Sequence, residues 1–377
     1  MILVFNAGSS TLKFGVFDER TLEARASGTL EEMPSDRVLE HILQSHSLGS
    51  LKEIKAVGHR VVHGGERFRA PTLIGRDVMA EIERLSPLCP QHNPPALRMI
   101  ESVWRELPEI PQIAVFDTAF FAALPPQRAV YPVPYEWHTE WGIRRFGFHG
   151  ISHAYCAERA AEMLGRSSTG FGVIVCHLGS GCSAAAIQNG RPVATTMGFT
   201  PLEGLMMATR SGSIDPGILF YLMKERGLTA NELEDALYHR SGLLGVSGIS
   251  GDVREVAEAA ERNDARAELA LALYADGVRS AVGSLAVFLD RLDAIVFTAG
   301  VGENSARIRE AVGGGLRSLG VVLDPVKNAS ARPDVDIAAP SSSARLFVIH
   351  TREERMIARA VHEELRARGG AVSLNSD

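Results

Sequence analysis

The stretch Met1-Ile-Leu-Val-Phe-Asn-Ala-Gly-Ser-Ser-Thr-Leu-Lys13 decides how the rest of the chain is organised. Residues 2–5 are apolar and partly β-branched, which predicts a buried strand. Residues 6–10 are small or turn-forming, and residues 12–17 alternate with a period of two, which predicts a second strand. A turn this small exposes its backbone N–H groups beside hydroxyls and is able to hold phosphate oxygens.

This first turn has a simpler alternative explanation. The stretch lacks the Gly-x4-Gly-Lys-Ser/Thr pattern of a P-loop, and no helix follows it. Taken alone, it is better explained as an ordinary Gly-Ser hairpin turn. A phosphate-binding role therefore needs support from elsewhere in the chain.

An internal repeat supplies that support. In Gly172-Val-Ile-Val-Cys-His-Leu-Gly-Ser-Gly-Cys-Ser183 an apolar strand again leads into a glycine-serine turn, and a second strand is predicted over residues 184–187. Asn189-Gly190 then gives a strong hairpin signal. A strand predicted over residues 294–298 leads into a third glycine turn over residues 299–305. Two similar turns far apart in one chain indicate a duplicated domain with a ligand in the cleft between the copies.

Length and composition exclude several classes of protein. The 377 residues are enough for two domains, each with its own core. A net charge of -6 gives no support for a nucleic-acid or anionic-membrane partner. The four cysteines form no Cys-x-x-Cys pair, which argues against a disulfide framework or a zinc ribbon. No segment resembles a signal peptide or a membrane span, so we expect a cytoplasmic protein.

Strand-like and helix-like segments alternate along the chain, as in an α/β fold. Further strands are predicted over residues 56–65, ending in a glycine turn, and over 113–116. Asp117-Thr118 directly follows the latter, at the end of a strand where α/β sheets present ligand contacts. Helices are predicted over residues 36–44, 78–85, 96–106, 255–262, 265–289, 305–319 and 353–367.

Three segments are expected to depart from this pattern. Residues 86–95 contain four prolines and are expected to lack regular structure. Residues 131–137 are expected to be extended, and we place a domain boundary at 135/136. Residues 369–377 are expected to form a frayed tail. The domains are then residues 1–135, completed by a C-terminal helix over 353–377, and residues 136–352.

The sequence argues against three other motifs. Gly179-Ser-Gly-Cys-Ser-Ala184 matches the dinucleotide fingerprint, but a hairpin follows where a helix is required, which argues against a Rossmann dehydrogenase. No Gly-x-Ser-x-Gly is present, which argues against the usual serine-hydrolase elbow. The pairs His59/His63 and His149/His153 lack the Glu of His-Glu-x-x-His, so a structural or substrate role is favoured over zinc.

Eight segments together resemble the acetate/propionate kinase family, in order from residue 4 to about residue 359. They are Phe5-Asn-Ala-Gly-Ser-Ser10, Gly58-His-Arg-Val-Val-His-Gly-Gly65, Phe116-Asp-Thr-Ala-Phe120, Arg145-Phe-Gly-Phe-His-Gly-Ile-Ser-His153, Gly198-Phe-Thr-Pro-Leu-Glu-Gly204, Thr209-Arg-Ser-Gly-Ser-Ile-Asp-Pro216, Ser247-Gly-Ile-Ser250 and Phe297-Thr-Ala-Gly-Val-Gly-Glu-Asn-Ser305. Each motif alone is weak, but so many in register are specific.

The resemblance implies a fold and a reaction. The fold is α/β, with two duplicated actin-like (ribonuclease H-like) domains and an interdomain active-site cleft, in a homodimer. The reaction is reversible in-line transfer of the ATP γ-phosphoryl group to acetate, giving acetyl phosphate and ADP. A propionate or other short-chain carboxylate kinase is the alternative. A non-catalytic nucleotide-switch module of the same fold is a remoter one.

The chemistry of this reaction can be compared with the residues. A carboxylate has a pKa of about 4 and is already ionised near neutral pH, so it needs no general base. It needs relief from anionic repulsion and stabilisation of the transferring phosphoryl group. Arginine suits both tasks, because it is permanently charged and bidentate. The resemblance assigns Arg60 to the carboxylate and Arg210 to the phosphoryl group. The alternative for each is a structural or surface ion pair with no part in the reaction.

The remaining roles are also implied by the resemblance. His149 would donate to a phosphoryl oxygen in the transition state, and Asp117 would position either Arg60 or the metal-bound phosphate. A satisfied core histidine is the alternative for His149. Mg²⁺, or Mn²⁺ in its place, would lie at Asn6 and Glu353, since Mg²⁺ takes few protein oxygens and several waters.

The implied binding residues fall into five groups. The phosphate turns are Ser9, Thr11 and Lys13; then His177, Leu178, Gly179, Ser180 and Gly181; then Gly300, Val301, Gly302, Glu303 and Asn304. The adenosine side is Asp252, Val253 and Arg254, and the acyl pocket is Val62, Phe148 and Pro201, with Gln91 beside it.

The chain departs from the family pattern at five positions. These are Gln91 for the usual Leu, Phe121 for a frequent His, Ser180 for Asn, Ala208 for Gly, and Val253 for an aromatic that packs on adenine. A pocket that hydrogen-bonds a substrate hydroxyl discriminates strongly against analogues lacking it, so Gln91 leaves a substituted acid open as the substrate.

Overall fold

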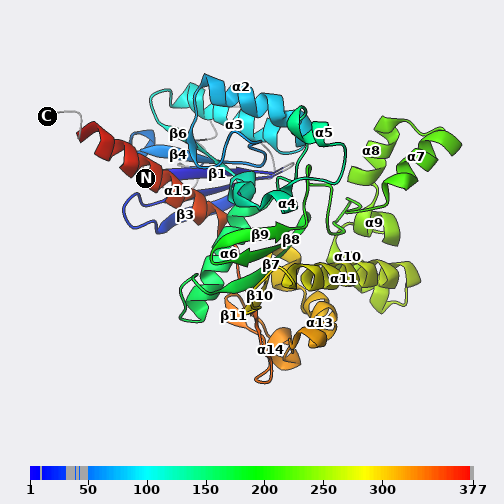
Figure 1. Ribbon diagram of the computed structural model, residues 1–377. Coiled ribbons are helices and arrows are strands. Elements are labelled where there is room, and N and C mark those ends of the chain that lie inside the picture. The colour runs from blue at the N-terminus through cyan, green and yellow to red at the C-terminus, as the bar shows by residue number, and fades with distance from the viewer. Residues whose placement is uncertain (9–10, 31–38, 40–41, 43–49, 374–377) are drawn as a thin grey trace. The chain divides into compact units, whose positions relative to one another are not determined.

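The computed structural model describes residues 1–8, 11–30, 39, 42 and 50–373 of the chain (Figure 1). The chain divides into two compact units. Unit 1 comprises Met1–Ala122, Phe148–Ile151 and Arg352–Asp377, and unit 2 comprises Ala123–Gly147 and Ser152–Thr351. Along the chain the first division therefore falls between Ala122 and Ala123, before the position suggested by the sequence.

Unit 1 contains a six-stranded sheet in the order β3-β2-β1-β4-β6-β5. The strands are β1 (Ile2–Ala7), β2 (Leu12–Phe17), β3 (Ala24–Leu30), β4 (Ala56–Val61), β5 (Thr72–Leu73) and β6 (Gln112–Phe116). The first three form an antiparallel meander, β1, β4 and β6 run parallel, and β5 is antiparallel to β6. The predicted strand–turn–strand at the amino terminus is confirmed.

Unit 2 repeats this sheet strand for strand. Its order is β9-β8-β7-β10-β12-β11, again with an antiparallel meander, three parallel strands and one antiparallel edge strand. The strands are β7 (Gly172–Leu178), β8 (Cys182–Gln188), β9 (Arg191–Thr195), β10 (Ala294–Thr298), β11 (Val335–Asp336) and β12 (Arg345–Val348). The predicted α/β class and the duplication of the domain are therefore confirmed.

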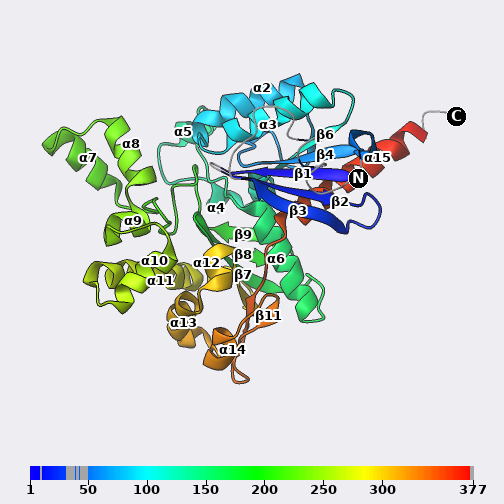
Figure 2. The same ribbon diagram turned by 180° about the vertical axis from the view of Figure 1, so that it is seen from behind.

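Helices on the two faces of the first sheet bury its alternating side chains. Leu3 and Phe5 point to the face where α3 (Asn93–Glu106) contributes Met99 and Val103. Ile2 and Val4 point to the other face, where α15 (Glu353–Ser373) packs, because successive strand residues face opposite sides. Both views show α2 (Arg76–Leu85) beside α3 on the same side of the sheet (Figure 1, Figure 2).

The remaining helices complete the chain. In unit 2, α11 packs on β7 and β8 and is the longest helix. The bounds are η1 (Leu51–Glu53), η2 (Ser86–Leu88), η3 (Asp117–Ala123), α4 (Pro126–Ala129), α5 (Tyr135–Thr139), α6 (Gly150–Met163), α7 (Pro216–Glu225), α8 (Ala230–His239), α9 (Gly242–Ser247), α10 (Val253–Glu261), α11 (Ala265–Ala286), α12 (Ala299–Asn304), α13 (Ala306–Gly314), η4 (Arg317–Leu319) and α14 (Pro325–Ala329).

Two predictions of irregular structure were wrong. The proline-rich segment 86–95 forms η2 and the start of α3, with Pro94 and Pro95 in the first turn of that helix. Proline is tolerated there because the first helical N–H groups have no partner within the helix. Segment 131–137 is not extended throughout, because α5 begins at Tyr135.

The third glycine turn, expected over residues 299–305, is instead the short helix α12. Glu303 Oε1 accepts from the backbone N–H of Ala299 at 3.0 Å, which closes the turn locally despite the glycines. The helix expected over 305–319 is divided into α13 and η4. Local capping and packing decided these boundaries, not residue propensity.

The predicted start of the carboxyl-terminal tail, at residue 369, was also too early in the chain. Helix α15 continues to Ser373, because a glycine in a helix costs only about 1 kcal/mol and does not by itself end it. The helix expected over 36–44 lies outside the described residues except for Leu39 and Ile42, which are both buried in the core of unit 1. None of the helices among the described residues combines the length and apolar character that a membrane crossing requires.

Candidate active site

The carboxyl ends of three parallel strands in unit 1 bring Asn6, Arg60 and Asp117 together, because parallel strands end at the same edge. Arg60 donates from Nε and NH2 to Asp117 Oδ2 at 3.1 and 2.6 Å. Its NH1 donates to Asn6 Oδ1 at 3.0 Å. The guanidinium is thus fixed by three hydrogen bonds to two strand ends.

Two carboxylates at the start of α15 complete this cluster. Asn6 Nδ2 donates to Glu353 Oε2 at 2.9 Å and to Glu354 Oε1 at 3.1 Å. The Asn6 amide is therefore oriented with its oxygen on Arg60 and its nitrogen on the acids. Glu353 Oε2 lies 3.7 Å from Arg60 NH1. Sequence reasoning missed Glu354, which follows Glu353 in a run of charged residues with no distinguishing signal.

Burial and charge oppose each other in the Arg60–Asp117 pair. Burial lowers the pKa of Arg60, but the charges of Asp117 and Glu353 outweigh it and raise the pKa above its ordinary value. Burial raises the pKa of Asp117, against the guanidinium of Arg60 and a backbone hydrogen bond from His149. Asp117 Oδ1 is buried and has no hydrogen-bond partner among the described residues. A buried acceptor in that state suits a ligand, a metal or a water.

His149 lies against this cluster in a strained backbone conformation. Its φ is +57°, in the left-handed region that non-glycine residues seldom occupy. A Cβ on the next residue, Gly150, would lie 2.0 Å from the carbonyl oxygen of Asp117. Only glycine permits this close approach of two backbones, which explains the glycine after His149.

His63, three residues after Arg60, is packed by residues from two other segments of unit 1. Val62 and Phe148 are buried, and the His63 ring meets the Phe148 ring edge-on at 5.4 Å between centroids. Asn93 holds the backbone of His63 through hydrogen bonds of 3.0 and 3.1 Å. Gln91 is half-buried and stands two residues before Asn93. Unit 1 therefore brings Phe148 and Asn93 together at His63.

The first turn is closed by a hydrogen bond from Gly8 N to Thr11 O at 2.8 Å. Thr11 is half-buried, and Lys13 is exposed and pairs with Asn6 in the β1–β2 ladder. Ser9 lies outside the described residues.

The second turn, in unit 2, has a similar form. Gly179 N donates to Gly181 O at 3.1 Å, and Ser180 between them is exposed. His177 Nδ1 lies 2.8 Å from Ser152 Oγ, and Leu178 is fully buried. Thr351 Oγ1 donates to Ser152 Oγ at 3.0 Å.

Arg210 lies close to this second turn. The backbone N–H of Ala208 donates to Ser180 O at 3.1 Å. Arg210 NH1 donates to the carbonyl oxygen of Pro201 at 3.2 Å. Unit 2 therefore brings together Ser180, Arg210 and Pro201, which the sequence had assigned to three different functions.

The third group centres on Glu303 and includes residues that sequence reasoning missed. Glu303 Oε1 accepts from Thr351 N at 3.2 Å, and Oε2 lies 2.6 Å from His350 Nδ1. Burial raises the pKa of Glu303, but the hydrogen bond and charge of His350 outweigh it, so the net pKa is lowered. The available signal for His350 and Thr351 was their place directly after the apolar run 346–349. Gly300 and Asn304 are exposed, Gly302 is buried, and Val301 is half-buried.

The adenosine-side residues are already engaged within unit 2. Asp252 caps α10 by accepting from Arg254 N at 2.8 Å, and it forms a 2.6 Å ion pair with Arg254 NH2. That side-chain hydrogen bond lowers the pKa of Asp252. Val253 is buried in the core. Each of these residues, which the sequence assigned to the adenosine side, therefore has a structural role.

The part of the chain that the structure describes contains no group of three or more His, Cys, Asp or Glu side chains arranged for a metal ion. Oxygen donors are nevertheless present beside Arg60. Asp117 Oδ1 and the Glu353 carboxylate are the hard ligands that Mg²⁺ prefers, with waters completing its shell.

Known proteins match almost the whole chain. A family model described as the acetokinase family matches residues 31–359. Acetate kinase from Gloeobacter violaceus is 51% identical over 351 residues, covering 92% of this chain and 85% of the relative. Acetate kinase from Desulfitobacterium hafniense (strain Y51) is 43% identical over 387 residues, covering 95% and 97%.

Solved structures agree. Porphyromonas gingivalis acetate kinase matches with a TM-score of 0.88 and 38% identity, covering 97% of this chain and 99% of that one. A propionate kinase from Francisella tularensis subsp. tularensis matches with a TM-score of 0.88 and 38% identity, covering 95% and 98%. With its motifs in order along a duplicated α/β fold, the chain belongs to the acetokinase family.

Proposed function

We propose that this protein is an acetate kinase, which transfers the γ-phosphoryl group of ATP to acetate reversibly and in line, giving acetyl phosphate and ADP. Family membership supports the transfer of a phosphoryl group to a carboxylate. The observation that carries the proposal for this chain is the state of Arg60, a nearly buried guanidinium fixed by hydrogen bonds to Asp117 and Asn6.

The hydrogen bonds of Arg60 leave room for one carboxylate. A guanidinium has five N–H donors. Three of them serve Asp117 and Asn6, so one N–H on each terminal nitrogen has no hydrogen bond within the described residues. Two donors from one guanidinium match the two oxygens of a carboxylate. Val62 and Phe148 would then receive the short acyl chain, together with Pro201.

Arg210 and His149 would act on the transferring phosphoryl group. Little covalent chemistry is asked of the protein in phosphoryl transfer, so positioning and charge stabilisation dominate. Arg210 supplies a permanent charge, and the His149 ring supplies a donor from a rigid, strained backbone. We infer that both act on the phosphoryl group during its transfer. Asp117 would hold Arg60 in place, as its two hydrogen bonds suggest.

ATP and a divalent cation complete the proposal. ATP or ADP is the co-substrate of the family. We infer that its phosphates are held by the two glycine-serine turns and by the residues of α12, and its adenosine by Asp252 to Arg254. Mg²⁺, or Mn²⁺ in its place, would be held by Glu353 and Asn6, with Asp117 Oδ1 nearby. Bound there, it would neutralise charge on the phosphates.

Two alternatives keep the same site. A propionate or other short-chain carboxylate kinase is favoured by the likeness to a solved propionate kinase and by the polar Gln91. A non-catalytic nucleotide switch is disfavoured, because such a protein would have no use for a buried arginine with two donors directed to a carboxylate.

We also infer that the protein works as a homodimer in the cytoplasm, where ATP is available. Helix α7 has no buried residue, although it is rich in large apolar side chains. Four of these are each between 46% and 61% exposed: Ile218, Phe220, Tyr221 and Met223. Exposed apolar faces of this kind mark association sites. Phe220→Glu should shift the mass in analytical ultracentrifugation from dimer to monomer, and a dimeric variant would contradict this interface.

The decisive experiment traps the product. The purified protein is incubated with ATP, Mg²⁺ and hydroxylamine together with acetate, propionate, butyrate or a 2-hydroxy acid, and acyl hydroxamate is measured. We expect the highest kcat/KM with acetate. No hydroxamate with any short acid would overturn the proposed function, and preference for a longer or hydroxylated acid would select the alternative substrate.

A further inference from the structure

Two segments of unit 2 that serve different parts of the proposed site run side by side. Residues 145–147 lead directly to Phe148 and His149 along the chain. The loop 196–205 carries Pro201, whose carbonyl oxygen accepts from Arg210. The backbones are joined where Phe146 N donates to Gly198 O at 2.9 Å. The side chains over this junction have no role in the proposed chemistry.

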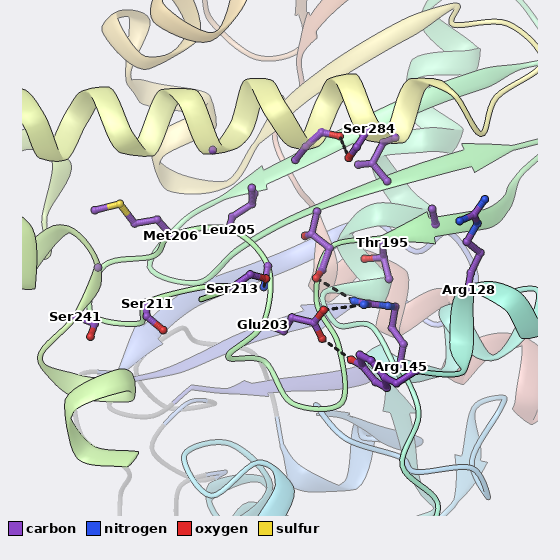
Figure 3. A pocket seen from close by; sticks show the side chains of 18 of the residues that line it. Arg128, Arg145, Thr195, Glu203, Leu205, Met206, Ser211, Ser213, Ser241 and Ser284 are labelled. Carbon is purple, nitrogen blue, oxygen red and sulfur yellow. Dashed lines mark hydrogen bonds and ion pairs between the residues drawn. The ribbon is translucent and has the colours of Figure 1, made fainter. Parts of the chain in front are cut away.

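Arg145 is the centre of the junction. Its NH1 donates to the carbonyl oxygens of Thr196 and Met197 at 3.1 and 3.0 Å. Its NH2 donates to Glu203 Oε1 at 2.7 Å. Figure 3 shows the Arg145 side chain directed at Glu203, on one side of a pocket within unit 2. One guanidinium therefore holds both ends of the loop.

Glu203 and Tyr131 close the loop from the other side. The Tyr131 hydroxyl donates to Glu203 Oε2 and accepts from Phe199 N at 2.9 Å. The Arg145 guanidinium carbon lies 5.2 Å from the centre of the Tyr131 ring. A Cβ at Gly198 would lie 1.7 Å from Glu203 Oε2 and 2.1 Å from the Tyr131 hydroxyl, so only glycine fits beneath them.

We propose that Arg145, Glu203 and Tyr131 are positioning residues that fix the loop seating Arg210 to the segment that delivers His149. The inference rests on the proposed function, because it is that function which makes Arg210 and His149 partners. These three residues are named here the 145–203 clamp, and they hydrogen-bond to one another and to the loop backbone. They act through Pro201 O and through the backbone of residues 146–149.

A clamp of this kind matters because phosphoryl transfer depends on geometry. A misplacement of about 1 Å caused by a distant change can lower a rate roughly 100-fold. Arg145 serves its three acceptors from one rigid planar group, whereas the ammonium of lysine is a point charge on a flexible chain. Charge alone at position 145 is therefore not enough.

The test uses the full-length variants R145A, E203A and R145A/E203A. Each single change should lower kcat about 10- to 100-fold while ATP binding, measured by calorimetry, stays near that of the unchanged protein. The double variant should be no slower than the slower single variant, because both changes break one clamp. Hydrogen exchange should become faster at residues 196–205 and 146–149 in all three.

The matched control is R166A, which removes a 2.7 Å ion pair with Asp293 in the same unit and should leave kcat and exchange at these residues unchanged. Native kcat in E203A, or losses that multiply in the double variant, would overturn the inference. If the alanine variants do not fold, R145K decides: a tenfold loss of kcat supports the clamp, and native kcat overturns it.

Hydrogen exchange separates this inference from the proposed function. If the unchanged protein makes no acyl phosphate, the function fails. The clamp is then supported by faster exchange at 196–205 in E203A, and overturned if exchange there is unchanged.

Discussion

The two sheets have the same strand order, yet the polar groups at their carboxyl edges differ. In unit 1, Asn6 and Arg60 are the penultimate residues of β1 and β4, Asp117 follows β6, and Arg60 hydrogen-bonds to both other side chains. In unit 2, His177 lies at the end of β7 and meets the Ser152 hydroxyl, and His350 stands two residues after β12 and meets Glu303. The same backbone therefore supports an arginine-centred cluster in one copy and histidine, hydroxyl and glycine groups in the other.

The difference indicates a division of labour. A nearly buried ion pair costs desolvation free energy and is weak support for stability by itself. We infer that unit 1 keeps the Arg60–Asp117 pair because a carboxylate substrate needs a fixed cation. Unit 2 offers turns whose backbone groups suit phosphate.

The largest expected effect comes from Arg210→Ala in unit 2. The variant should lose about 10²–10³ in kcat, the usual result of removing one preorganised donor to the transition state. ATP binding should be nearly unchanged, because the turns remain. Steady-state kinetics and calorimetry measure the two quantities. Equal loss of both would show that the site had misfolded and would remove the contrast with unit 1.

The acid sensitivity of unit 1 gives the next largest effect. Burial lowers the pKa of His59 from 6.5 to about 4. Between these values the unfolded chain binds a proton at His59 that the folded chain does not. The free energy of unfolding is therefore unaffected by His59 above pH 6.5 and decreases as the pH falls toward 4. The loss should be on the order of 3 kcal/mol across this window. His59→Gln should remove this pH dependence of the unfolding free energy, measured by urea unfolding at several pH values.

An exposed histidine, His239, is the matched control for that experiment. His239→Gln should leave the pH dependence of the unfolding free energy as it is. An unchanged slope in His59→Gln would show that another group is responsible.

Arg60→Lys tests the assignment of the carboxylate substrate to unit 1. Lysine keeps the charge but cannot serve Asp117, Asn6 and a bound carboxylate in the fixed directions of a guanidinium. The KM for acetate should rise about 10- to 100-fold, as expected for the loss of a charge-assisted hydrogen bond of roughly 1.5–3 kcal/mol. The KM for ATP should change little. A rise in KM for ATP without one for acetate would contradict the assignment of unit 1 to the acid.

The last comparison is between two glycines and includes the smallest expected effect, at Gly283. At Gly283 in α11, a Cβ would have no atom within 4 Å outside its own stretch of helix, so Gly283→Ala should stabilise the protein by about 0.5–1 kcal/mol. Gly150→Ala should instead destabilise the protein and lower its activity, because its Cβ would lie 2.0 Å from the carbonyl oxygen of Asp117. Thermal unfolding and the hydroxamate assay measure both. Normal activity in Gly150→Ala would show that this close approach is not required.

Much of the fold was predictable where local patterns were strong. The apolar runs predicted β1, β4, β6, β7 and β10, and the repeated glycine-serine turn predicted the duplication. The errors arose where local capping, or the tolerance of a first helical turn for proline, outweighed residue propensity. Glu303 closes α12 around glycines, and the prolines at 94 and 95 start α3 although they appeared to exclude it.

The sequence by itself determined the two α/β repeats, the family, and a short set of arginine, histidine and acidic residues that carry the proposed chemistry. Only the tertiary structure decided that the Asn6 amide faces Arg60 with its oxygen and that two Arg60 N–H donors have no hydrogen bond within the described residues. It also decided that Arg145 holds the loop of Pro201. The physical reason is distance along the chain. Asn6 meets Glu353 across a sequence separation of 347 residues, and no local pattern records a contact that folding alone creates.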